Sequence, residues 1–260
     1  MNVDRDALAP RLSGTPLVLL LDVDGTIAPI APRPGDATVP PPTRDAIQTL
    51  ARTAGVVVGL VSGRAAADVR RLVRLEPVWV IGNHGAEIVS PDGHETVEPR
   101  VAAFETEVAA ARRALEAVEA RGVAVENKRW TLTVHYRNAD AEEVPGLRET
   151  ITRVAAEHGL VTATGKKVLE LRPPVDVNKG TAVIALAERL GGLGPGASLL
   201  YAGDDSTDED AFRALRTHAP RAVTMRVDGD EGSPETFAEY IVSDPMEMGS
   251  VLAWLAELRR

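Results

Sequence analysis

The sequence predicts an α/β protein with a Rossmann-like core built on a parallel sheet and a second α/β domain inserted into it. Two observations predict this fold class. Short apolar strands alternate with helical stretches over residues 17–82 and again after residue 178, as in βαβ units. From about residue 100 to 172 the order changes to one helix followed by two strands, repeated once, with prolines at both borders.

The core elements follow from apolar runs and from the residues that begin or end them. In the first half we predict, in order, strand 17–22, helix 43–54, strand 56–61, helix 64–74 and strand 78–82. Thr43 is the expected N-cap of the first helix, and Gly55 follows its end. Residues 29–42 contain six prolines and predict a surface loop. A hairpin comes next, with Pro91-Asp92-Gly93 as its turn.

The inserted block has a helix, a strand and a strand, twice over. We predict helix 100–121, strands 123–126 and 130–136, helix 141–158, and strands 160–164 and 167–171. The core then resumes with helix 180–190, strand 198–202, helix 208–216, strand 221–227 and strand 240–242. A last helix begins with Asp244 as N-cap and Pro245 as its first residue. The predicted domains are a core of residues 1–98 and 175–260 and an inserted domain of residues 99–174.

Composition favours a soluble enzyme and excludes several other classes. The 29 basic and 38 acidic residues give a formal net charge of −9, which argues against a nucleic-acid partner. The chain has no cysteine, so disulfides and thiol nucleophiles are excluded. The first sixteen residues lack the apolar stretch of a signal peptide, and no apolar run approaches the length of a membrane span. We therefore expect a cytoplasmic protein without a membrane partner or an obligate protein partner.

The most informative residues are two carboxylates at the end of the first strand. Asp22 and Asp24 follow the apolar run 17–21 and are two positions apart. Because side chains alternate along a strand, both project from the same face at its carboxyl end, where open α/β sheets bind ligands. Two carboxylates this close indicate a bound metal or an acid/base pair. The alternative is an ordinary strand-to-turn junction, in which Asp and Gly are common.

Two more polar residues are placed for the same edge of the sheet. Ser62 follows strand 56–61, and its hydroxyl and the nearby N–H groups are suited to hold a phosphoryl oxygen. Lys179 stands at the start of helix 180–190, where a positive charge opposes the helix dipole. A purely solvent-facing role is therefore less favoured for Lys179 than for most lysines.

The third strand end is strongly acidic. Gly203 follows strand 198–202, and five acidic residues occur within residues 204–210. Asp204 and Asp205 come directly after the strand, so we expect them to meet Asp22. The later acids, Asp208, Glu209 and Asp210, are expected to open the next helix, whose positive dipole end suits them.

Taken in chain order, an Asp-x-Asp-Gly-Thr strand end, a serine strand end, a lysine and a Gly-Asp-Asp strand end resemble the haloacid dehalogenase superfamily of phosphotransferases. The resemblance implies that Asp22 is the nucleophile and Asp24 the general acid/base. It also implies that Ser62 and Lys179 bind the phosphate. A dehalogenase lacks the second acid, so Asp24 favours phosphoryl chemistry.

The same resemblance implies a magnesium cofactor. Mg²⁺ would be held by the carboxylates of Asp22 and Asp204 and by the backbone carbonyl of Asp24. The residues expected around these groups are Asp205 and Asp208 near the metal ligands, and Thr26, Gly63 and Arg64 near the substrate.

The chemistry is consistent with these roles. Attack on a phosphate monoester brings an anion against a dianion, so the site must supply positive charge, which Mg²⁺ and Lys179 would provide. Asp22 would accept the phosphoryl group as an acyl phosphate, which divides one difficult displacement into two easier ones. Asp24 would protonate the leaving oxygen and then deprotonate the attacking water.

Further stretches are similar to the trehalose-6-phosphate phosphatases within this superfamily. They are residues 82–87, 126–128, 133–137, 165–173 and 203–210. The insertion between the serine and lysine motifs matches the large α/β cap domain of sugar-phosphate phosphatases. The resemblance covers roughly residues 15–255 and implies hydrolysis of trehalose 6-phosphate to trehalose and phosphate, with a small sugar phosphate as the partner.

Two alternatives remain at this point. The core motifs and the cap type also fit a phosphatase for sucrose phosphate or mannosyl-phosphoglycerate, or a phosphomannomutase. From a different class, the fold could serve a non-catalytic regulatory subunit. The presence of Asp22, Asp24, Lys179 and Asp204 argues against that second reading, because a subunit without activity would be free to lose any of them.

Charged residues outside the core motifs are the candidates for binding the sugar. Charge-assisted hydrogen bonds to sugar hydroxyls favour Glu87, Arg137, Lys166 and Glu170. We expect Arg137 to share a strand face with Thr133 and His135, the alternative being an exposed polar face. Glu170 lies opposite the Val/Leu face only if its strand is irregular at Lys167. His84 either contacts substrate or is bonded to the backbone.

Overall fold

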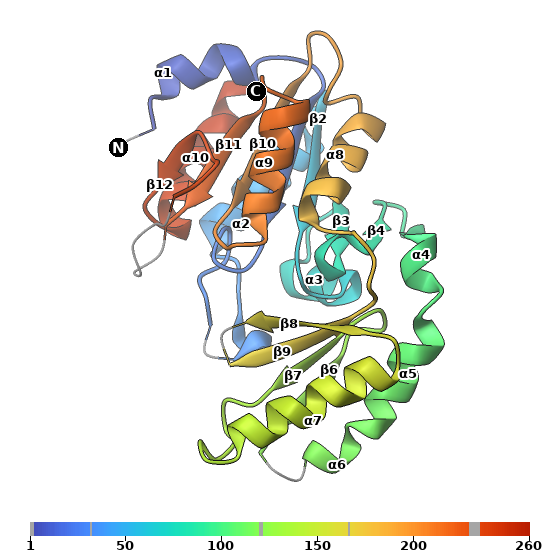
Figure 1. The fold of residues 1–260 in the computed structure, drawn as a ribbon. Helices are drawn as coiled ribbons and strands as arrows, with labels where there is room; N and C mark the ends of the chain where they lie inside the picture. Colours follow the sequence, from blue (N-terminus) through green and yellow to red (C-terminus); the bar gives the residue numbers. More distant parts are fainter. Residues whose placement is uncertain (1–2, 32, 120–121, 166, 229–234) are drawn as a thin grey trace. The chain divides into compact units, whose positions relative to one another are not determined.

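The computed structural model describes residues 3–31, 33–119, 122–165, 167–228 and 235–260 (Figure 1). It separates into two compact units. One comprises the described residues up to Thr96 and those from Val177 onward, and the other comprises Val97–Asp176. Each unit has a buried apolar core of its own. The predicted α/β class, with a mainly parallel core sheet and a separate small sheet, is confirmed.

Among the described residues, the core sheet has eight strands in the order β12-β11-β10-β1-β2-β3-β4-β5. Their bounds are β1 Leu17–Asp22, β2 Val56–Val61, β3 Trp79–Gly82, β4 Glu87–Val89, β5 Glu95–Val97, β10 Ser198–Gly203, β11 Val223–Val227 and β12 Tyr240–Val242. The pairs from β12 through β3 are parallel, and β3 pairs with β4 antiparallel. Because β1, β2 and β10 are parallel neighbours, their carboxyl ends meet at one edge.

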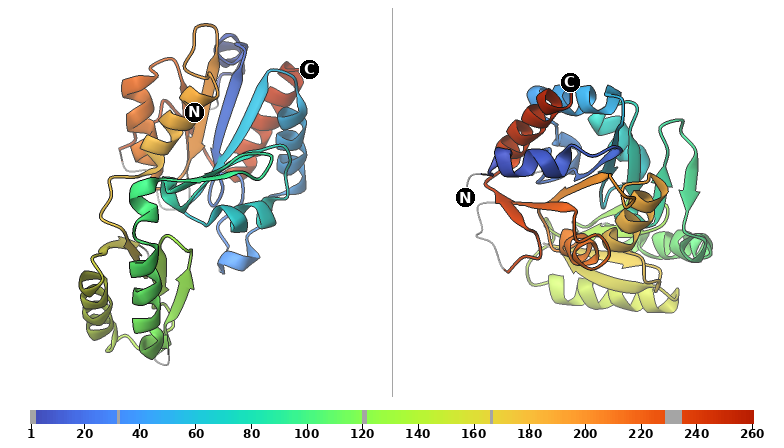
Figure 2. Two further views of the ribbon diagram at one scale, coloured as in Figure 1. Left: turned by 90° about the vertical axis from the view of Figure 1, so that its right-hand side faces the viewer. Right: turned by 90° about the horizontal axis from the view of Figure 1, so that it is seen from above.

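Helices cover both faces of this sheet (Figure 2). The core helices are α1 Arg5–Leu8, α2 Pro41–Arg52, α3 Ala66–Val73, α8 Lys179–Arg189, α9 Asp208–His218 and α10 Pro245–Leu258, with short 3₁₀ turns η1 Ala9–Leu12, η2 Pro34–Asp36 and η3 Asn83–Gly85. In β1, Leu19 and Leu21 pack into the core with α2, α3 and α10. Val18 and Leu20 pack into the core with α8 and α9. Burial on both faces explains why β1 is apolar at successive positions.

The second unit has one helical layer on one sheet. Its elements are α4 Pro99–Ala102, α5 Glu105–Ala114, α6 Glu116–Glu119, β6 Ala124–Asn127, β7 Leu132–His135, α7 Val144–Glu157, β8 Val161–Gly165 and β9 Val168–Arg172. Its described strands form an antiparallel sheet in the order β6-β7-β9-β8. Leu132, Val134, Leu169 and Leu171 turn one face of the sheet toward α5 and α7. The opposite face carries Thr133 and Glu170 at its centre, together with the smaller apolar residues Ala163 and Val168.

Two predicted elements differ from the structure. The single helix predicted for 100–121 is divided into α4, α5 and α6, and positions 120–121 lie outside the described residues. The N–H groups of Phe104 and Val118 each donate to the carbonyl three residues earlier, as in a 3₁₀ turn. These tighter turns interrupt the helix, while the apolar residues keep a helix-like spacing in the sequence. Thr43 is not an N-cap, because the consecutive prolines let α2 begin at Pro41. Thr43 is buried instead against Gly249, where an added Cβ would lie 2.3 Å from the threonine hydroxyl.

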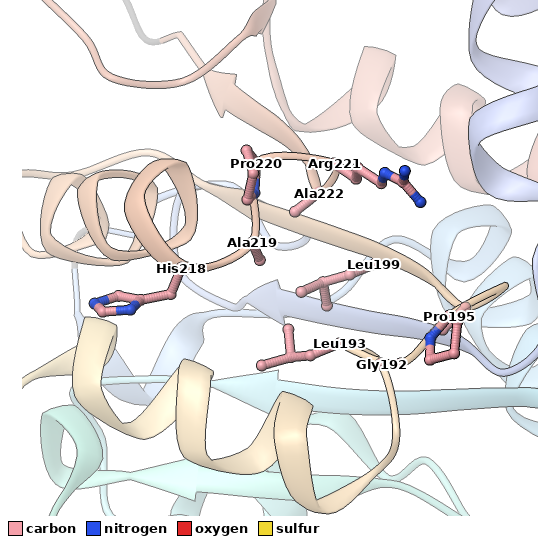
Figure 3. A pocket seen from close by; sticks show the side chains of 11 residues that line it. Gly192, Leu193, Pro195, Leu199, His218, Ala219, Pro220, Arg221 and Ala222 are labelled. Atoms are coloured by element: carbon pink, nitrogen blue, oxygen red, sulfur yellow. The ribbon is translucent and has the colours of Figure 1, made fainter.

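A pocket of about 280 Å³ lies near the amino end of β10, at the edge of the sheet opposite the strand ends that carry the carboxylates (Figure 3). Leu193, Leu199 and Ala222 line it, with His218 and Arg221 among the polar residues. None of the predicted site residues lines this pocket. In the described part of the chain, no helix is both long and apolar enough to cross a membrane.

Candidate active site

Asp22 and Lys179 form a buried ion pair at the carboxyl edge of the core sheet. Asp22 is the last residue of β1, and Nζ of Lys179 lies 2.7 Å from its Oδ1. Lys179 is the first residue of α8, and Asn178 caps that helix by accepting a hydrogen bond from the N–H of Thr181. The cap fixes where the helix begins, and Lys179 therefore enters the site from a defined position.

Lys179 is surrounded by three carboxylates. Its Nζ also lies 2.8 Å from Oδ1 of Asp208 and 3.7 Å from Oδ1 of Asp205. Burial lowers the pKa of Lys179, but the charges of Asp208, Asp22 and Asp205 outweigh burial and raise that pKa well above its ordinary value. Lys179 is therefore a permanent cation, and it brings positive charge to the nucleophile predicted from the sequence.

Asp208 organises this cluster from within. Its Oδ1 accepts hydrogen bonds from Lys179 and from the hydroxyl of Tyr201, and its Oδ2 accepts from the N–H groups of Asp204 and Asp205. Asp208 does open α9, as expected, but its side chain is fully buried and turned into the site. Four donors fill the four lone-pair positions of a carboxylate, so the role that fits Asp208 is to orient its neighbours.

Asp204 lies close to Asp22, as the sequence predicted. The hydroxyl of Thr26 is 3.1 Å from Oδ2 of Asp22 and 3.3 Å from Oδ1 of Asp204. Between them Gly25 has a φ of +87°, and an added Cβ would lie 2.1 Å from the Asp204 carboxylate. Only glycine can therefore turn the chain here while the two acids approach each other.

The proximity of the acids fits a cation site. One ligand atom each of Asp22, Asp204 and Asp208 lies within 4.8 Å of the others. Burial, followed by the nearby carboxylates Asp208 and Asp205, raises the pKa of Asp204 to about 7. Burial also raises the pKa of Asp22, although Lys179 opposes this. A hard cation such as Mg²⁺, whose preferred ligands are oxygens, would reduce the repulsion among these buried carboxylates.

The side chain of Asp24 is held apart from this acid cluster by Arg64. Nε of Arg64 lies 2.6 Å from Oδ2 of Asp24, and Nη2 lies 2.6 Å from Oδ1. The arginine therefore grips both carboxylate oxygens. We predicted from the sequence that both residues lie at the same edge of the sheet, but not that they pair with each other.

Ser62 and Gly63 form a close-packed turn at the end of β2. Ser62 is buried; its N–H donates to the carbonyl of Ile81, and its hydroxyl oxygen accepts from the N–H of Arg64. An added Cβ at Gly63 would lie 2.3 Å from the ring of His84, so the histidine packs directly on this turn. The hydroxyl hydrogen of Ser62 is still suited to donate to a phosphoryl oxygen.

His84 and Glu87 both have partners within the protein. His84 has a φ of +55°, its ring packs on Gly63, and its main-chain N–H donates to the carbonyl of Ser62. These contacts test neither alternative for the role of the His84 side chain. Oε1 of Glu87 accepts from the N–H of Ala66 at 2.7 Å and from the amide of Asn83 at 2.8 Å. Burial raises the pKa of Glu87. Glu87 thus binds the start of α3, and the side-chain amide of Asn83 holds it there.

Glu170 lies on the polar face of the small sheet. It pairs across the strands with Thr133 and Ala163, and its Oε1 is 3.9 Å from Nζ of Lys128. β9 is regular from Val168 onward, so strand alternation alone puts Glu170 opposite Leu169 and Leu171, and the positive φ of +60° at Lys167 lies in the turn before the strand. The expected dependence on an irregular strand at Lys167 was wrong. Lys128 belongs to a stretch that we noted, but we did not predict its place beside Glu170.

The other predicted sugar contacts are placed differently or are not described. Arg137 is exposed and lies beyond the end of β7 at His135, so it does not share a strand face with Thr133; that prediction was wrong. The strand pairing ends at His135 opposite Val168, where the facing chain turns with a φ of +60° at Lys167. Lys166 lies outside the described residues.

Known proteins are similar to this chain over most of its length. A family model described as trehalose-phosphatase matches residues 20–246. The chain is similar to an uncharacterized glycosyl hydrolase of Mycobacterium tuberculosis, with 40% identity over 87% of this chain and 17% of that protein. It is 36% identical to the trehalose-phosphate phosphatase of Mycobacterium tuberculosis over 89% of this chain and 60% of that protein. The chain therefore spans less than two thirds of these relatives.

A solved structure of a trehalose-6-phosphate phosphatase related protein is similar over 93% of this chain and 97% of that chain. The two have a TM-score of 0.77 and 27% sequence identity. The C-terminal domain of trehalose-6-phosphate phosphatase from C. albicans has the same fold, with a TM-score of 0.75 over 98% of this chain and 97% of that chain at 23% identity.

Proposed function

Because the chain belongs to the trehalose-phosphatase family, we propose that it hydrolyses trehalose 6-phosphate to trehalose and phosphate. The observation that carries this proposal is the buried pair of Asp22 and Lys179 beside Asp204, at the carboxyl edge of the sheet. A nucleophilic carboxylate, a fixed cation and a second acid are the groups that transfer of a phosphoryl anion requires.

The first half-reaction uses Asp22 and Asp24. A carboxylate oxygen of Asp22 attacks phosphorus, the bond from phosphorus to the sugar oxygen breaks, and an aspartyl phosphate forms. Lys179 lies 2.7 Å from Asp22, and its charge stabilises the phosphoryl oxygens as they approach the carboxylate. Asp24 gives its proton to the sugar oxygen, because an alkoxide is a poor leaving group.

The second half-reaction restores the enzyme. Asp24, now deprotonated, takes a proton from a water molecule, and the water oxygen attacks phosphorus. The acyl phosphate bond breaks, which releases inorganic phosphate and the Asp22 carboxylate. A single residue thus acts as acid and then as base. Ser62 is buried at the neighbouring strand end, where its hydroxyl is suited to hold a phosphoryl oxygen through both steps.

Mg²⁺ is the proposed cofactor. Asp22, Asp204 and the backbone carbonyl of Asp24 would hold it, and Asp208, whose carboxylate already accepts four hydrogen bonds, would orient its neighbours beside the ion. When bound, Mg²⁺ neutralises negative charge on the phosphoryl group. The raised pKa of Asp204, caused first by burial and then by the neighbouring carboxylates, supports the fit of a cation to this cluster.

The polar face of the small sheet is the proposed sugar-binding surface. Glu170 and Lys128 are both largely buried there, and Glu126 lies 3.1 Å from His135 on the same face. Carboxylate and ammonium groups form charge-assisted hydrogen bonds with sugar hydroxyls. Arg137 and Lys166 remain proposed contacts from the sequence, as does Glu87, whose carboxylate has the protein partners given above.

The proposed function is tested with purified protein and trehalose 6-phosphate in the presence of Mg²⁺. We expect release of inorganic phosphate together with trehalose, identified by chromatography. Asp22→Asn should show no turnover while keeping the thermal unfolding midpoint of the parent within a few degrees. Absence of trehalose formation would contradict the substrate. An active Asp22→Asn protein, shown by mass to be free of deamidated material, would contradict the mechanism.

A further inference from the structure

The pairing of Arg64 with Asp24 has a geometry that constrains how the carboxylate is presented. Nε and Nη2 of Arg64 each lie 2.6 Å from a different oxygen of Asp24. Two parallel charge-assisted hydrogen bonds fix the plane of the carboxylate as well as its distance from the guanidinium. The side chains are 16% and 31% exposed, so water weakens this ion pair less than it weakens pairs on the surface.

The backbone on the arginine side of the pair is also fixed. The carbonyl of Arg64 accepts from the N–H of Asn83 at 2.8 Å, and the N–H of Arg64 donates to the hydroxyl of Ser62 at 3.1 Å. Asn83 is itself held by Glu87. On the other side, Asp24 forms a backbone bridge with Ala28. The guanidinium therefore joins two rigid strand ends, which is how a group is preorganised for proton transfer.

We propose that Arg64 is the positioning residue for Asp24, and that its contribution to the reaction passes through that carboxylate. Lys179 is the cation next to the nucleophile, so the positive charge for the phosphate has another source. Arg64 instead sets the orientation of Asp24: its two hydrogen bonds use one lone pair on each oxygen and leave one on each to carry the proton. This inference rests on the proposed phosphatase chemistry, and it replaces the earlier expectation that Arg64 binds substrate.

The two roles give different results in a double-mutant cycle. If Arg64 acts only through Asp24, Arg64→Gln should cost activity in the parent and nothing further in Asp24→Asn. If Arg64 binds the phosphate, its loss should cost activity in both backgrounds and should weaken inhibition by inorganic phosphate. Arg64→Lys keeps the charge but cannot bond to both oxygens in the same way, so its activity should be as low as that of Arg64→Gln.

The experiment uses single-turnover release of phenol from phenyl phosphate and of p-nitrophenol from p-nitrophenyl phosphate. Phenolate is a more basic leaving group than p-nitrophenolate, so its departure depends more on a proton from the enzyme. Comparing the two substrates therefore measures the acid step without any sugar. We expect Arg64→Gln and Arg64→Lys to slow the first substrate by roughly 10- to 100-fold and the second far less. The inhibition constant of inorganic phosphate should stay within about twofold of the parent.

Arg71→Gln is the matched control, because Arg71 also pairs with an aspartate, Asp68, at 2.7 Å but lies exposed on α3. It should leave both rates unchanged. Equal slowing of both aryl phosphates by Arg64→Gln, additive losses with Asp24→Asn, or phosphate inhibition weakened in proportion to the lost rate would overturn the inference. A parent that hydrolyses aryl phosphates but not trehalose 6-phosphate would contradict only the proposed substrate. Thermal unfolding of every variant identifies any that fail to fold.

Discussion

The ammonium group of Lys179 lies 2.7 Å from the carboxylate of Asp22, and both side chains are buried at the end of β1. The lysine comes from the first turn of α8 and the aspartate from the central strand, so the pair joins two elements that are distant in the sequence. An ion pair removed from water is costly to form, and it is more costly to break on one side only. This arrangement places a fixed positive charge at the proposed nucleophile.

Replacing Lys179 should therefore affect stability as well as activity. Lys179→Gln leaves Asp22 and Asp208 buried without their cation, so the free energy of unfolding at pH 7.5 in EDTA should fall by roughly 3 kcal/mol. Turnover of any phosphate ester should be lost. Urea unfolding measures the first effect, with Lys167→Gln as the control, since Lys167 is exposed. Equal unfolding midpoints for the two variants would contradict the structural role of Lys179.

Stabilisation by Mg²⁺ should depend on pH. The pKa of Asp204 is raised from 3.8 to about 7, first by burial and then by its acidic neighbours. In the metal-free protein the folded state therefore holds a proton that the unfolded state releases, and this contribution to stability is lost as pH rises from about 4 to about 7. Because Mg²⁺ binds the deprotonated carboxylate, its stabilising effect should be larger above pH 7.

Thermal unfolding with and without Mg²⁺ measures this linkage. The increase in unfolding temperature caused by Mg²⁺ should be larger at pH 8 than at pH 5.5 in the parent. Asp204→Asn should remove most of the increase at both values. The same Mg²⁺ effect at both pH values, or an undiminished effect in Asp204→Asn, would show that the cation does not bind these carboxylates.

The hydroxyl of Tyr201 should matter through Asp208. Tyr201 is fully buried, packs edge-to-face on Phe212 at 5.5 Å and donates to Oδ1 of Asp208. Tyr201→Phe removes one donor from a buried carboxylate and should cost about 1 to 3 kcal/mol of unfolding free energy. Tyr240→Phe is the control, because its hydroxyl meets Arg11 remote from the site. No greater loss for Tyr201→Phe than for Tyr240→Phe would contradict the role given to Asp208.

The polar face of the small sheet should affect sugar phosphates and spare aryl phosphates. Glu170→Ala and Lys128→Ala should lower kcat/KM for trehalose 6-phosphate by about one to three powers of ten, since a buried polar contact is worth ~1 to 3 kcal/mol. Hydrolysis of p-nitrophenyl phosphate should change far less. Glu157→Ala, on the exposed side of α7, is the control. Parallel losses with both substrates would remove the sugar-binding role of this face.

The sequence was sufficient to predict which groups gather at the sheet edge. Apolar runs that end in Asp22, Ser62 and Asp204 must bring those residues together once their strands are parallel neighbours, and strand alternation is a strong local signal. Lys179 was identified by its charge at a helix start. These predictions require only that each segment is recognised as a helix or a strand and that its last residue is located. The pattern of apolar residues indicates both.

The sequence was less informative about how polar side chains choose partners. Arg64 could have faced the phosphate, and only the packed structure pairs it with Asp24. The position of Asp208 in the chain predicted a first-turn acid, and only the family resemblance put it near the metal ligands; its bond to Tyr201 is seen in the structure alone. Which partner a polar side chain binds depends on the other side chains that the fold brings near it from distant segments. The spacing of residues along the sequence does not show this.

The most direct test of the proposed function is the ratio of kcat/KM for trehalose 6-phosphate to that for glucose 6-phosphate, measured on the parent protein with Mg²⁺. The two substrates present the same phosphoryl end and differ in the second ring. A site built for trehalose 6-phosphate should prefer it by about tenfold or more, corresponding to ~1.4 kcal/mol of additional transition-state binding. Equal values for the two substrates would contradict the assignment of trehalose 6-phosphate as the substrate.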